Sequence, residues 1–178
     1  MKKINIIFGF LSMFMFGWHA TMSCQYMFGG EPYSVAYRMS GMILAGIASI
    51  HMIPNLIQMV QTSKKMDNQT LYPALITETY FQNISGIIII VFMCTHPIMV
   101  ELGYAFTSPA LNIIRFILDS GLYIVMSVHL FFGFSHMFIS FGIITDRLCF
   151  KVLRYITAAT MAVVCIILIT ACARYCLM

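Results

Sequence analysis

Residues 83–104 read NISGIIIIVFMCTHPIMVELGY, and this stretch decides the fold class. It holds a single carboxylate, Glu101, and a single histidine, His96, in an otherwise apolar or small-residue run. About 20 consecutive apolar residues are enough for an α-helix to cross the hydrocarbon core of a bilayer. The stretch therefore predicts a transmembrane helix.

Four more apolar runs are each long enough to cross, at residues 4–23, 38–61, 111–144 and 153–173. The whole chain is 61% hydrophobic and only 9% charged, whereas roughly a quarter of the residues in a soluble domain are charged. We therefore predict an all-α integral membrane bundle of five transmembrane helices. Residues 1–178 are expected to form this single membrane domain, with no separate soluble domain.

The basic residues predict the orientation of the bundle, because Lys and Arg concentrate on the inner side of a membrane. With the N-terminus inside, seven of them fall on the inner side and three on the outer side. The inner set is Lys2, Lys3, Lys64, Lys65, Arg147, Lys151 and Arg154, and the outer set is Arg38, Arg115 and Arg174. The bias favours an inner N-terminus and an outer C-terminus. Since the basic residues sit at the ends of the apolar runs, no nucleic-acid partner is expected.

Each of the first four predicted spans carries one histidine, and these four are the informative polar residues: His19, His51, His96 and His129. Ionisable residues at membrane depth are costly and usually face the bundle interior with a partner. In the predicted orientation His19 and His96 lie toward the outer side, and His51 and His129 lie further in. Opposed neutral imidazoles are strong axial ligands for haem iron. The pattern predicts two haem groups, one held by each pair.

The order and depth of these histidines resemble those of a known family, the five-helix di-haem cytochrome b subunit that anchors succinate dehydrogenases and fumarate reductases. Residues 82–96 (QNISGIIIIVFMCTH) look like the third helix of that family, with ten positions between the glycine and the ligand. Residues 129–133 (HLFFG), running on to Gly142, look like its fourth helix. His19 and His51 fall where the first two helices of the family carry their ligands.

The resemblance implies a function for the chain as one subunit of a larger enzyme, a succinate:quinone oxidoreductase. The implied partners are a flavoprotein subunit, which carries the dicarboxylate active site, and an iron–sulfur subunit. Electrons would pass through two haem b groups between the iron–sulfur subunit and a membrane quinone. The implied location is the cytoplasmic membrane of a bacterium or the mitochondrial inner membrane.

Three further residues are candidates for contacts with a haem propionate or a quinone: His136, Arg115 and Glu101. His136 follows His129 by two helical turns on the same face, so it is also an alternative ligand. Arg115 is four residues before Asp119, a spacing at which the two side chains can pair. Glycines at 46, 86 and 133 would let a flat macrocycle approach the backbone.

Two prolines lie close to the predicted ligands. Pro97 directly follows His96, and a proline disfavours helical geometry in the residue before it. Pro54, three residues after His51, is expected to kink the second span.

Other functions remain open from the sequence. One alternative is the cytochrome b subunit of another quinone-linked oxidoreductase. The 16 methionines add a second, a histidine/methionine metal transporter, because thioether and imidazole together suit copper. A helical assembly subunit without a cofactor is a third. An absorption spectrum of the purified protein would separate the cytochromes from the others.

Overall fold

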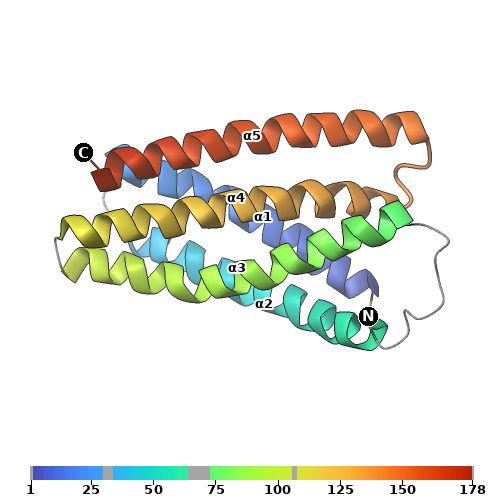
Figure 1. The fold of residues 1–178 in the computed structure, drawn as a ribbon, viewed down its shortest axis with the longest axis horizontal. Helices are drawn as coiled ribbons and strands as arrows, with labels where there is room; N and C mark the ends of the chain where they lie inside the picture. Colours follow the sequence, from blue (N-terminus) through green and yellow to red (C-terminus); the bar gives the residue numbers. More distant parts are fainter. Residues whose placement is uncertain (1, 30–33, 64–72, 106–107, 178) are drawn as a thin grey trace.

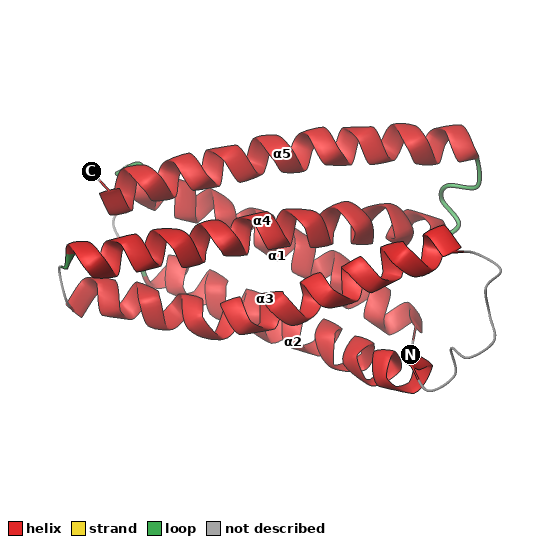
Figure 2. Ribbon diagram, viewed as in Figure 1, coloured by secondary structure: helices red, strands yellow, loops and turns green. Residues whose placement is uncertain are grey.

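The computed structural model describes residues 2–29, 34–63, 73–105 and 108–177, and within these ranges the chain is helical and contains no strand (Figure 2). In chain order the helices are α1 (Lys2–Met27), α2 (Val35–Ser63), α3 (Pro73–Ala105), α4 (Pro109–Ser140) and α5 (Arg147–Leu177) (Figure 1). The all-α prediction is confirmed for the described part of the chain.

All five helices are long and apolar enough to cross a membrane. Large apolar side chains point outward from them, with Val91 59%, Ile117 61% and Ile166 64% exposed. Lipid solvates such a surface, whereas water does not. The two chain ends lie at opposite ends of the bundle (Figure 1). We call the end with the N-terminus the inner end and the other the outer end, following the predicted orientation.

The helices begin and end at other residues than the predicted spans do. The third helix begins at Pro73, ten residues earlier than the predicted 83, and the fifth begins at Arg147 rather than 153. The fourth helix ends at Ser140, although its apolar run continues to 144. The backbone turns there because Gly142 adopts a left-handed φ of 71°, a conformation that ends helices and favours glycine.

Both prolines lie inside continuous helices. The helix α3 runs through Pro97 to Ala105, and α2 runs through Pro54 to Ser63. The expectation that Pro97 would interrupt helical geometry at His96 is therefore wrong. Transmembrane helices tolerate proline because neighbouring groups satisfy the freed carbonyls.

The helices associate as two hairpins with a fifth helix alongside. The closest packing is of α1 on α2, of α3 on α4, and of α4 on α5, whereas α2 and α3 make few contacts. At the outer end α5 also reaches α1, where a buried cluster forms from Met27, Tyr123, Leu168, Ala171, Cys172 and Cys176. Each hairpin is thus well packed internally, and a cavity separates the α1–α2 hairpin from the α3–α4 hairpin.

Candidate functional site

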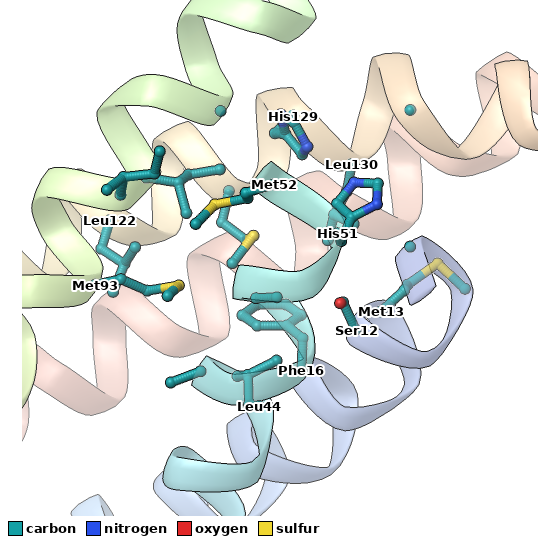
Figure 3. A pocket seen from close by; sticks show the side chains of 18 of the residues that line it. Ser12, Met13, Phe16, Leu44, His51, Met52, Met93, Leu122, His129 and Leu130 are labelled. Carbon is teal, nitrogen blue, oxygen red and sulfur yellow. The ribbon is translucent and has the colours of Figure 1, made fainter. Parts of the chain in front are cut away.

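The cavity between the two hairpins has a volume of about 1210 Å³. Its wall is mostly apolar, and Figure 3 shows Met93, Leu122 and Phe16 among the side chains around it. The polar exceptions include the histidines His19, His51, His96, His129 and His136, all of which line it. Protein interiors are normally packed with few voids larger than a water molecule. A large apolar cavity with convergent imidazoles is the kind of site that binds a sizeable flat ligand.

At the outer end, the structure brings together His19 from α1 and His96 from α3. Their ring centroids are 6.5 Å apart and their planes are nearly perpendicular, at 89°. His19 also stacks on Tyr37 of α2, with centroids 5.2 Å apart and planes 9° apart. The two histidines belong to different hairpins, so they face each other across the cavity.

At the inner end, His51 from α2 and His129 from α4 enter the same cavity. Figure 3 shows both rings in the same part of the cavity, and they are near enough to interact electrostatically. This pair also joins the two hairpins. The structure thus brings His19 near His96 and His51 near His129, and the ligation of a haem by these pairs stays a prediction.

In the outer pair, each ring is held through its Nδ1 atom. Nδ1 of His19 lies 2.9 Å from Oγ of Ser40. The hydroxyl of Ser40 already donates to the carbonyl of Tyr37, so Nδ1–H of His19 is the donor in this contact. Nδ1 of His96 lies 2.7 Å from Oδ1 of Asp119, and an ionised carboxylate accepts hydrogen bonds only.

The inner pair follows the same rule. Nδ1 of His51 lies 3.0 Å from the backbone carbonyl of Asn5, and Nδ1 of His129 lies 3.1 Å from that of Gln82. Ser85 also accepts from His129, at 3.0 Å, because its own hydroxyl donates to Gln82.

All four rings therefore carry a proton on Nδ1, and in the neutral form of each ring the lone pair lies on Nε2. This is the tautomer that a metal-binding histidine needs, with the second nitrogen anchored by a hydrogen bond.

Glycines on the partner helix give the rings room. A Cβ at Gly9 would lie 2.9 Å from Cε1 of His51, and one at Gly41 would lie 3.1 Å from Cε1 of His19. A Cβ at Gly86 would lie 3.3 Å from Cε1 of His129. In each case the glycine belongs to the other helix of the same hairpin, so each hairpin supports its own histidines.

These contacts follow a regular spacing along the sequence. Each of the first four helices carries a supporting residue and, ten positions later, a histidine. The supporting residue contacts the histidine of the partner helix. The pairs are Gly9 and His19, Gly41 and His51, Gly86 and His96, and Asp119 and His129. Ten residues span about 15 Å of helix, which is the axial distance between the two levels. Antiparallel helices with this shared spacing bring both contacts into register.

Only part of this pattern is predicted from the sequence. The ten-residue spacing in the third helix is visible there, but Gly86 is expected to admit a macrocycle, whereas in the structure it accommodates the ring of His129. Nothing in the described structure lies within 4 Å of a Cβ built at Gly46, and one at Gly133 would meet the side-chain amide of Gln82. The repeated spacing from a small residue to a histidine was the signal that could have located Gly9 and Gly41.

His136 differs from the four paired histidines. Its Nε2 atom lies 2.9 Å from Oε2 of Glu78, and Glu78 also pairs with Arg154. The guanidinium of Arg154 lies 4.9 Å from the centre of the Phe131 ring. Since the carboxylate engages Nε2 of His136, the geometry favours His129 over His136 as the ligand at the inner level.

The other two candidates lie near the outer end. Arg115 is buried, with its Nε atom 3.6 Å from Oδ2 of Asp119 and its guanidinium 4.8 Å from the centre of the Tyr175 ring. It does not line the cavity, so the propionate contact that the sequence allowed is not the contact it makes. Glu101 does line the cavity, and it pairs with Arg38 at 2.8 Å on the exposed surface.

The ring spacing of the outer pair can be compared with that of two imidazoles on one metal ion. Two imidazoles bound on opposite sides of one metal ion at about 2 Å would have ring centres roughly 6.3 Å apart, close to the 6.5 Å of His19 and His96. The donors are neutral nitrogens with anchored rings, as haem iron requires. Among the described residues, no group of three or more His, Cys, Asp or Glu side chains could hold a metal ion. Axial ligation needs only two protein ligands.

Comparisons of this chain with models of protein families, with curated proteins and with solved structures give no match.

Proposed function

We propose that this chain is a haem-binding membrane anchor that carries electrons through the bilayer to or from a quinone. The observation that supports it most is the common state of four histidines in one cavity. Each has its Nδ1 atom tied to an acceptor, and Nε2 of His51 also lies 3.4 Å from the side-chain amide nitrogen of Asn55. The pairs His19 with His96 and His51 with His129 would each hold one haem b.

The residues of the chain then have separate tasks. The hairpins fix the height of each ligand pair through the contacts of Gly9, Gly41 and Gly86. The apolar wall excludes water, which affects the reduction potential of a bound group. When bound, haem b supplies one-electron redox chemistry. Two levels separated by about 15 Å would let electrons cross most of the membrane in two stages.

We propose further that the electrons come from, or go to, an iron–sulfur subunit bound at the inner end, next to a flavoprotein that acts on succinate or fumarate. This part is drawn from the family resemblance. The start of α5 supports a docking site there, since it brings Arg147 and Lys151 to the inner end of the bundle. The positive-inside rule would also produce these charges.

The first experiment is a reduced-minus-oxidised absorption spectrum of the full-length protein in detergent. We expect low-spin haem b bands and two haems per chain. The His136→Ala variant is the matched control and should keep both haems, because Nε2 of His136 is engaged by Glu78. A colourless protein, or loss of a haem in the control, would contradict this assignment.

The second experiment tests the partners and the orientation. Purification in mild detergent should bring down a flavoprotein and an iron–sulfur protein in equal amounts. Copurification with a molybdenum or nickel enzyme would instead support the cytochrome b subunit of another oxidoreductase. Reporter fusions after residues 66 and 178 should lie on opposite sides of the membrane, with the first inside.

A further inference from the structure

Asp119 on α4 differs in kind from the groups that support the other three paired histidines. Its side chain is 3% exposed, and its Oδ1 atom lies 2.7 Å from Nδ1 of His96. The other three rings donate to a hydroxyl or to a backbone carbonyl. At the position where the repeated spacing has glycine in the first three helices, the fourth helix has a carboxylate.

A buried cation lies next to Asp119. Arg115, one turn earlier on α4, has a side chain only 6% exposed and lies 3.6 Å from Oδ2 of Asp119. An arginine stays protonated in proteins, and a buried guanidinium needs a counterion. Asp119 is the counterion of Arg115 in this buried pair.

Asp119 is placed to act through His96. Neither Asp119 nor Arg115 lines the cavity, whereas His96 does. A hydrogen bond from Nδ1–H to a carboxylate raises the basicity of the opposite nitrogen, more than a bond to a neutral oxygen does. A more basic ligand stabilises the more positive, oxidised form of a bound metal.

We propose that Asp119 is a positioning residue that fixes the orientation of His96 and lowers the reduction potential of the outer haem. Arg115 pairs with the carboxylate and does not line the cavity. The inference rests on the proposed function, because it concerns the haem that His96 would hold. The buried pair of Asp119 and Arg115 thus lowers the reduction potential of the outer haem and leaves that of the inner haem unchanged.

The test is a redox titration of both haems in the full-length protein, with the EPR spectrum of the oxidised outer haem as a second readout. In Asp119→Asn, which keeps the shape and the acceptor oxygen, the outer haem should become easier to reduce. We expect at least a tenfold change in its oxidation equilibrium, about 59 mV for a one-electron couple. The inner haem should keep its potential.

Two further variants separate the possible causes. Asp119→Asn combined with Arg115→Gln removes both charges, so it avoids an unpaired buried guanidinium that could prevent folding. Its outer haem should still be easier to reduce, since Asp119 contacts the ligand and Arg115 does not. The control Asp146→Asn removes an equal charge at the exposed start of α5 and should move neither potential.

The outcomes distinguish the inference from the proposed function. A wild-type protein without haem overturns both. A wild-type protein with two haems, whose outer potential and EPR spectrum are unchanged in the double variant, overturns the role of Asp119 alone. Equal shifts of both haems would also overturn it, because they would show a general field effect rather than an effect through His96.

Discussion

At the outer end of the cavity one histidine hydrogen-bonds to serine and the other to a buried carboxylate, whereas at the inner end every acceptor is a neutral oxygen. The two ends share the same hairpin register and the same tautomer. They also differ in support, because α5 packs a buried cluster behind the outer pair. The comparison indicates that the register of the hairpins sets the ligand geometry, while single neighbouring residues set the electronic character of each level.

The largest effects are expected from two single variants, each of which removes one histidine from one level. His51→Ala should abolish the inner low-spin haem, or convert it to high spin, and leave the outer one intact. His96→Ala should do the reverse, because each iron would lose one of its two axial ligands. Optical and EPR spectra of both variants provide the measurement. Circular dichroism should first show that each variant is correctly folded. Loss of both haems in a folded variant would show that the two levels are not independent.

A smaller effect is expected from filling the space beside a ring. Gly9→Ala would place a Cβ 2.9 Å from Cε1 of His51, so the ring must shift away from its anchoring carbonyl. We expect about a tenfold weaker affinity for the inner haem, as for other changes in the shell behind a metal ligand. Haem titration of the apoprotein measures it.

The matched control for this change is Gly46→Ala, since the described structure has nothing within 4 Å of a Cβ at that position. It should leave both affinities unchanged. If Gly46→Ala weakened the affinity for the inner haem as much as Gly9→Ala does, the cause would be a general change in helix geometry and not the fit of the His51 ring.

A third prediction compares the two serines. Ser40→Ala leaves Nδ1–H of His19 without its acceptor, a cost of roughly 1–3 kcal/mol for a buried donor. Ser85→Ala should cost less, because the carbonyl of Gln82 still accepts from His129. The rate of haem loss on mild heating should therefore rise more for the outer haem of Ser40→Ala than for the inner haem of Ser85→Ala. Equal rates would show that serine hydroxyls do not hold these rings.

The smallest effect is expected at Asp146, which lies outside both levels. Its Oδ2 atom accepts from the backbone N–H groups of Leu148 and Cys149, at 2.9 and 3.0 Å, and these bonds hold the pKa of the carboxyl below its ordinary value of 3.8. Its contribution to helix stability is therefore present above that value and is lost as the pH falls through the lowered pKa. Asp146→Ala should abolish this acid-dependent step.

Amide hydrogen exchange in the first turn of α5 measures the loss of this cap. The exchange should be faster in Asp146→Ala at neutral pH, while both haem spectra stay the same. A change in either haem would mean that the start of α5 communicates with the cavity.

The five apolar helices follow from the amino-acid sequence alone. The length of an apolar segment is a local property, and it decides whether the segment can span a bilayer as a helix. It also predicts the sorting of His19, His51, His96 and His129 by depth, since the position of a residue along a spanning helix sets its level. Helix ends were less accessible: Gly142 stops α4 inside an apolar run, and α3 continues through Pro97.

Only the tertiary structure decided which groups hold each ring. The contact of His96 with Asp119, and that of His51 with Asn5, depend on how two antiparallel helices are aligned. The sequence paired Asp119 with Arg115 by their spacing, and the structure keeps this pair, but it adds the histidine of another helix to it. Local patterns cannot give such alignment, because it is set by the packing of side chains that lie far apart in the chain.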